Sequence, residues 1–186
     1  RKADLIISEI LSAEFVGEGV RTRIFDANKR LLKKNGKMIP ESGTIKISLL
    51  GNDKEIVNTI SVANVSGFDL SEFNSISQSK FNHFLKKKPT LLSNNEDAFR
   101  INLYNEENIV KEEKIIELKV NKEGLCLGVI QWMKIQLYKD IEYENSPSGH
   151  LDIPSHWPTP IYLFDKPVSV KKGDVLKIRG FLDTDN

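Results

Sequence analysis

Two glutamates near the start of the chain, Glu9 and Glu18, are the residues whose type and spacing best suit chemistry. Glu9 ends an apolar run, and Glu18 stands between Gly17 and Gly19. This pattern is typical of a strand that delivers acids to the rim of a sheet, where open α/β folds bind ligands. Two carboxylates held close together repel each other unless a cation lies between them. We therefore expect a cationic ligand, and a guanidinium is the natural one.

A guanidinium stays protonated in water, and its planar fork of five N–H donors can be gripped by two carboxylates from two sides. Such binding neutralises the charge of the ligand and orients one of its nitrogen atoms. If a sulfonium methyl lay beyond that nitrogen, orientation and placed charge would provide most of the catalysis. The same spacing also fits a solvated acidic loop without any such role.

A second motif near the C-terminus is Pro154-Ser155-His156-Trp157-Pro158. By itself, this histidine would be a capping or packing residue. Together the two motifs resemble the protein arginine N-methyltransferase family. In that family a double-E loop carries two glutamates at this spacing, and a Thr-His-Trp loop of the C-terminal barrel packs beside it. Ser155 stands where the family usually has Thr.

Two further segments fit the same resemblance. Residues 29–40 look like the family's helix, glycine turn and strand that ends in proline, and Gly67-Phe68-Asp69 resembles the segment that follows its dimerisation arm. The resemblance implies an α/β fragment followed by a mostly β, barrel-like domain. Residues 1–40 would be the C-terminal piece of a Rossmann-like methyltransferase domain. Residues 41–186 would be the β-barrel domain that binds substrate.

The resemblance also implies roles for single residues. Glu9 and Glu18 would hold the guanidinium of a protein arginine. His156 would hydrogen-bond one carboxylate and help to pass the lost proton to water, which suits the ordinary pKa of histidine.

Three other residues would shape the same cleft. Trp157 would form one wall, and Gly17 and Gly19 would let the loop turn tightly around the substrate. Family members that make asymmetric dimethylarginine carry Met two residues after each glutamate, whereas Leu11 and Val20 stand here. The product type therefore stays open, and the loop is closer to the family's divergent branch.

The methyl donor implied by the resemblance is S-adenosylmethionine. The family binds it with a glycine-rich loop and an acid on earlier strands, and the chain contains no G-x-G-x-x-G or P-loop pattern. We therefore expect the cofactor pocket upstream of Arg1 and expect this chain to be a C-terminal fragment that is inactive alone. A non-catalytic relative, whose barrel and acidic cleft bind a partner's arginine without methylating it, fits the same residues.

Composition sets further expectations. The chain has 27 basic and 26 acidic residues, a net charge of +1, so no overall field recruits nucleic acid or an anionic membrane. The partners expected are an arginine-containing protein and a second copy of the chain, although the stretch 51–65 is short for a dimerisation arm. We expect the single cysteine, Cys126, to be a small, buried hydrophobic residue. It cannot form an internal disulfide, which favours the cytoplasm or the nucleus.

Hydrophobic periodicity predicts the elements that must position these residues. We expect a strand over 3–9, then a helix from Val20 to Leu32 with Gly36 at its C-cap. Residues 40–43 break the pattern, and 68–95 form a long connection with helical turns. Trp132 is expected in the core. Alternation or composition predicts strands at 45–49, 55–65, 98–104, 114–120, 129–138, 161–164 and 174–180.

Overall fold

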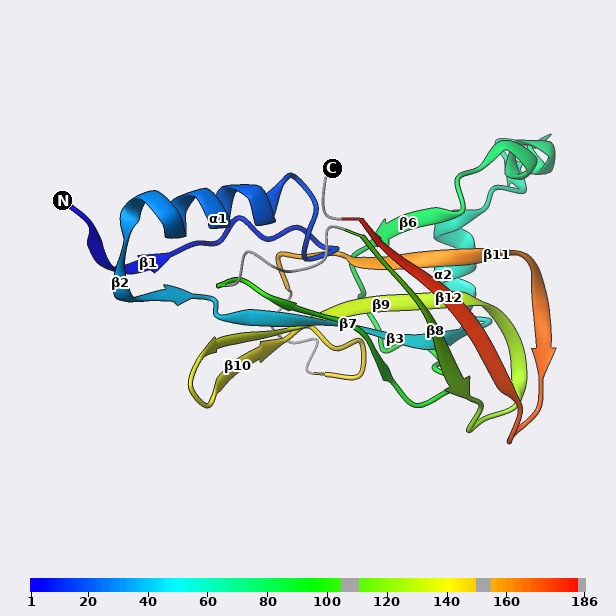
Figure 1. The fold of residues 1–186 in the computed structure, drawn as a ribbon. Coiled ribbons are helices and arrows are strands. Elements are labelled where there is room, and N and C mark those ends of the chain that lie inside the picture. The colour runs from blue at the N-terminus through cyan, green and yellow to red at the C-terminus, as the bar shows by residue number, and fades with distance from the viewer. Residues whose placement is uncertain (105–110, 150–154, 184–186) are drawn as a thin grey trace.

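The computed structural model describes residues 1–104, 111–149 and 155–183. Its N-terminal part is a β-α-β unit at one end of the molecule (Figure 1). The two strands are parallel neighbours, which requires a crossover connection between them. This confirms the α/β character expected for the start of the chain. The elements are β1 (Ala3–Ile7), α1 (Val20–Leu31) and β2 (Leu32–Ile39).

The predicted helix is confirmed, but the prediction that Gly36 caps it is wrong. The helix ends at Leu31, and Leu32 already has extended backbone angles and begins β2. Gly36 lies inside β2, where the pairing with β1 shifts between Ala3 and Leu5. A Cβ at Gly36 would lie 2.6 Å from the side chain of Leu32. Glycine is therefore needed at this irregular pairing for close packing, not for a left-handed cap.

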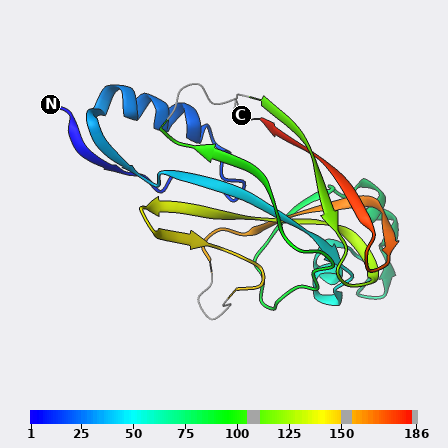
Figure 2. The ribbon, with the colours of Figure 1, turned by 60° about the horizontal axis from the view of Figure 1, so that its bottom comes forward.

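The rest of the chain is mostly β. An antiparallel sheet has the order β6-β11-β9-β3-β7, with β10 also paired to β9. A separate two-stranded ribbon, β8 with β12, crosses this sheet (Figures 1 and 2). The strands are β3 (Ser42–Gly51), β6 (Lys80–His83), β7 (Glu96–Asn102), β8 (Lys111–Lys119), β9 (Gly124–Tyr138), β10 (Ile141–Glu144), β11 (Thr159–Val170) and β12 (Val175–Asp183).

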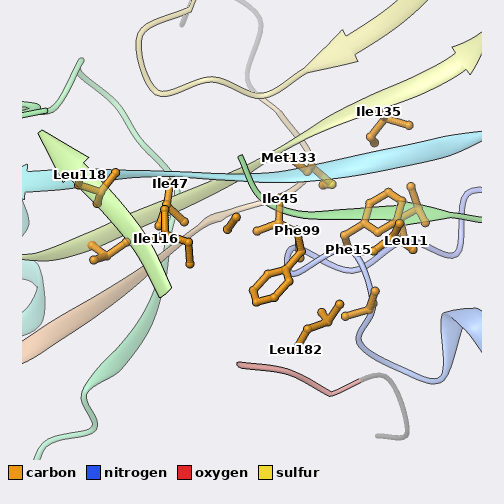
Figure 3. Close-up of a cluster of buried hydrophobic side chains, with 14 of the residues drawn as sticks. Leu11, Phe15, Ile45, Ile47, Phe99, Ile116, Leu118, Met133, Ile135 and Leu182 are labelled. Carbon is orange, nitrogen blue, oxygen red and sulfur yellow. The ribbon is translucent and has the colours of Figure 1, made fainter. Parts of the chain in front are cut away.

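The main hydrophobic core lies between the sheet and the ribbon (Figure 3). Ile45 and Met133 from the sheet meet Ile116 and Leu182 from the ribbon, and Phe15 from the N-terminal part joins the same cluster. Residues on both sides of position 40 thus share one core. Cys126 is buried there as well, and this burial raises the pKa of its thiol.

A second, smaller cluster lies on the other face of β9. It contains Ile130 and Trp132, which alternate along the strand with residues of the main core, and Ile56 covers them. Ile56 belongs to a helix, α2 (Lys54–Ile60), so the strand predicted over 55–65 is wrong. The N–H of Val57 donates to the carbonyl of Asp53 at 2.9 Å and starts the helix. Ile56 and Ile60 then share one buried face at helical spacing.

The long connection after α2 projects at the end of the molecule opposite to α1 (Figures 1 and 2). It holds a small hairpin and a 3₁₀ helix before the chain enters β6, a strand that the sequence pattern did not predict. These elements are β4 (Asn64–Val65), β5 (Phe68–Asp69) and η1 (Ser71–Ile76). Across the described ranges, no helix combines the length and apolar character that a membrane span requires.

Candidate active site

Glu9 and Glu18 lie at the two ends of one loop, residues 8–19, which connects β1 to α1. The N–H of Ser8 donates to the carbonyl of Ile39 at 2.8 Å, so parallel pairing continues to the residue before Glu9. Glu18 stands two residues before α1 begins. Both side chains are exposed. The sheet therefore delivers one acid, and the start of the helix delivers the other.

The middle of this loop is anchored in the core by Phe15. The residue has a left-handed backbone angle, φ 73°, which is unfavourable for a bulky side chain. Its ring is completely buried. The ring lies over Gly43 of β3, where a Cβ would be only 2.1 Å from it. Burial of the ring offsets the backbone strain and fixes the loop against the sheet.

The turn into Glu18 is tight. Glu18 and Gly19 both have left-handed angles, φ 62° and 68°, and the N–H of Gly17 donates to Ser12 Oγ at 2.9 Å. A Cβ at Gly17 would lie 2.7 Å from the same Ser12 oxygen. Arg23 Nε donates to the carbonyl of Glu18 at 3.2 Å. The backbone of Glu18 is thus held from both sides while its carboxylate stays exposed.

The Ser155–Trp157 segment is tied to the same loop. Trp157 Nε1 donates to the carbonyl oxygen of Leu11 at 2.7 Å, across 146 positions of sequence. The N–H of Trp157 donates to Ser155 Oγ at 3.1 Å, and that oxygen also bonds the Tyr143 hydroxyl at 2.9 Å. The Tyr143 and Trp157 rings are 5.6 Å apart, centroid to centroid. Sequence reasoning missed Tyr143, because nothing local marks it.

His156 is exposed between these two anchored neighbours. Among the hydrogen bonds and ion pairs of the described residues, none joins it to Glu9 or Glu18. The same part of the chain offers neither glutamate carboxylate a hydrogen-bond or ion-pair partner, and contains no group of His, Cys, Asp and Glu suited to a metal ion. The structure therefore brings the histidine-bearing segment to the loop, and within the described ranges both exposed carboxylates are available to a cationic ligand.

Comparisons with known proteins point in one direction. No protein-family model matches the chain. It is 28% identical over 180 residues to the arginine N(omega)-methyltransferase of Streptomyces achromogenes subsp. streptozoticus, covering 95% of this chain and 48% of that protein. It is 25% identical to protein arginine N-methyltransferase 2 of Xenopus tropicalis, covering 96% and 43%. The chain thus spans about half the length of each of these two curated relatives.

The fold is also found in a solved structure, the Trypanosoma brucei PRMT1 enzyme-prozyme heterotetrameric complex with AdoHcy. The TM-score is 0.78 at 17% identity, over 95% of this chain and 58% of that one. These matches confirm the resemblance that the two motifs predicted and the fold class expected from it.

Proposed function

We propose that this chain is the C-terminal part of an S-adenosylmethionine-dependent protein arginine N-methyltransferase and supplies its arginine-binding residues. The observation that carries the proposal is the loop 8–19. It is fixed to the sheet by Phe15 and to the C-terminal segment by Trp157, and it exposes the carboxylates of Glu9 and Glu18, which have no partner among the described residues. The curated relatives are named arginine methyltransferases, which supports a guanidinium as the ligand.

In this proposal the two carboxylates accept N–H bonds from the substrate guanidinium. Charge-assisted bonds of this kind are worth about 1.5 to 3 kcal/mol each. They would orient one nitrogen and stabilise the cation that forms there. His156, exposed next to Trp157, would pass the proton released by the substrate to water. Gly17 and Gly19 would keep the loop backbone close to the guanidinium.

S-adenosylmethionine would supply the methyl group, but the described residues do not fit a complete pocket for it. Their one parallel strand pair is β1 with β2, and the loop after β1 is the one that carries Glu9 and Glu18. No glycine-rich phosphate or nucleoside turn follows that strand. We therefore assign this chain no contact with the donor and place residues 1–40 at the end of a Rossmann-like domain, with 41–186 as the substrate-binding barrel.

Arginine-bearing proteins are the proposed partners, and a homodimer is the proposed assembly. The structural neighbour is part of a heterotetrameric complex, which supports oligomerisation in general. The proposed location is the cytoplasm or the nucleus.

A non-catalytic arginine-binding module is the second candidate. It is favoured because the described part of the chain contains both glutamates of the loop 8–19 but no glycine-rich turn that could bind the cofactor. Both candidates predict binding of an arginine peptide, but only the first predicts methyl transfer.

The test uses full-length protein, radiolabelled S-adenosylmethionine and two peptides that differ only by lysine in place of arginine. Calorimetry measures binding, and mass spectrometry locates any methyl group. Selective binding and methylation of the arginine peptide would establish the enzyme. Selective binding without methylation would establish the module, and equal binding of both peptides would overturn both candidates.

A further inference from the structure

A third acid of the loop, Glu14, is placed differently from Glu9 and Glu18. Its carboxylate forms an ion pair with Lys80, the first residue of β6, and its side chain is only 26% exposed. Lys80 Nζ also lies 5.8 Å from the ring centroid of Tyr162, its cross-strand partner on β11. Burial, and secondarily the charge of Glu14, raises the pKa of Tyr162 to about 12. Glu14 is therefore held against the sheet.

The other carboxylate oxygen of Glu14 faces the turn that leads to Glu18. It lies 3.2 Å from the position that a Cβ of Gly17 would take, and the Ser12 side chain closes over the same position. Gly17 directly precedes Glu18. The Glu14–Lys80 pair therefore rests on the backbone that sets the direction of the Glu18 side chain.

Two anchors thus connect the loop to β11 and to its neighbour β6. Trp157, two residues before β11 begins, holds the Glu9 half through the carbonyl of Leu11. Lys80 of β6, opposite Tyr162 near the start of β11, holds the Glu18 half through Glu14. One anchor lies on β6 and the other just before β11, so the pairing of these two strands relates the positions of the two halves of the loop.

We propose that Glu14 and Lys80 form a positioning pair that fixes Glu18 for guanidinium binding. As far as activity is concerned, this rests on the function proposed above. The pair is partly exposed, so it adds little to the stability of the fold. Its effect is on placement, and a displacement of about 1 Å in a reacting group can cost about a hundredfold in rate.

The first test measures methylation by the full-length protein. Glu14→Gln and Lys80→Met should each lower kcat by about tenfold or more, since Glu18 is misplaced. The charge-swapped double variant, Glu14→Lys with Lys80→Glu, should return kcat to within about threefold of the parent, because an ion pair forms again. Lys177→Gln breaks an exposed pair with Glu117 on the ribbon, which involves neither Glu14 nor Lys80, and is the matched control. It should leave kcat unchanged.

The second test does not depend on activity. Hydrogen exchange at the Gly17 amide, which donates to Ser12 Oγ, reports on the turn before Glu18. It should become about tenfold faster in each single variant, recover in the double variant and stay unchanged in Lys177→Gln, while the melting temperature hardly moves. Unchanged protection of Gly17 in both single variants would overturn the positioning pair. If exchange responds as expected but the parent methylates nothing, the proposed function fails and the pair stands.

Discussion

The ring of Phe15 fills the space above Gly43 that any side chain at position 43 would need. A Cβ there would lie 2.1 Å from the ring, closer than two non-bonded carbons can approach. Gly43 belongs to β3, and Phe15 lies between the two glutamates in the sequence. The loop that carries the proposed site therefore packs into the space that the missing side chain of Gly43 leaves on the sheet. Its position depends on this packing.

Replacing Gly43 by Ala should push the Phe15 ring out of place. Overpacking of this kind costs about 1 to 3 kcal/mol in the free energy of unfolding, measured by urea denaturation. Gly124→Ala is the control, because the nearest atom to its Cβ would be the flexible end of Leu92 at 3.2 Å. It should change stability much less. Equal effects of the two substitutions would show that the ring does not fill the space over Gly43.

Trp157→Phe keeps an aromatic ring but removes the N–H that donates to Leu11. The lost bond should cost about 0.5 to 1.5 kcal/mol and free the loop near Leu11. Trp132 lies in the second cluster and donates to Glu144 of β10 at 2.7 Å, so Trp132→Phe, which removes that bond, is a matched control. Only the Trp157 variant should shift the methyl resonances of Leu11 in NMR spectra. A Leu11 spectrum unchanged by Trp157→Phe would contradict the anchor.

Glu9→Gln and Glu18→Gln keep the shape of each side chain but remove one charge that would face the guanidinium. Each should lower methylation by the full-length protein about tenfold to a hundredfold, because every 1.36 kcal/mol of lost transition-state stabilisation is a factor of about ten. His156→Ala should cost less, and Glu123→Gln, in an exposed turn away from the loop, should cost nothing.

Cofactor affinity should hardly change in the two glutamine variants, which separates loss of substrate binding from loss of the donor. If both variants methylate at the rate of the parent, the proposal that the full-length protein is an enzyme would rest on the similarity of its fold alone.

Asp97 should make folding stability sensitive to acid. Lys46 at 2.5 Å and Arg100 at 2.7 Å donate to its carboxylate and hold its pKa below the ordinary value. A lowered folded-state pKa stabilises the fold above the unfolded value of about 3.9, and this contribution is lost as pH falls through the folded pKa. Between pH 6 and pH 3, the melting temperature should therefore fall further in the parent than in Asp97→Asn.

Glu113→Gln is the control for this acid effect. Its partner Arg179 also lowers the pKa of Glu113, but both groups are exposed and screened by water. On acidification, the melting temperature should fall by nearly the same amount in the parent and in Glu113→Gln. An Asp97→Asn protein that is as acid-sensitive as the parent would show that the Lys46 and Arg100 contacts do not stabilise the fold.

The sequence by itself determined the features that depend on near neighbours. The spacing of Glu9 and Glu18 and the two motifs indicated the family, and helical spacing indicated α1. Strict alternation located β9, since successive side chains of a strand point to opposite faces. The comparisons and the structure confirm these predictions, whereas the roles of the site residues stay predictions.

Tertiary structure decided whatever depends on contacts between distant segments. Ile56 and Ile60 fit a strand or a helix, and burial over Trp132 selects the helix. The pattern break at Gly43 turned out to be part of β3, where the missing side chain admits Phe15. Glu14 and Lys80 are far apart in sequence, and neither is unusual in its local surroundings. Packing across the core brings them together, because a contact between two surfaces depends on shapes that neither segment specifies alone.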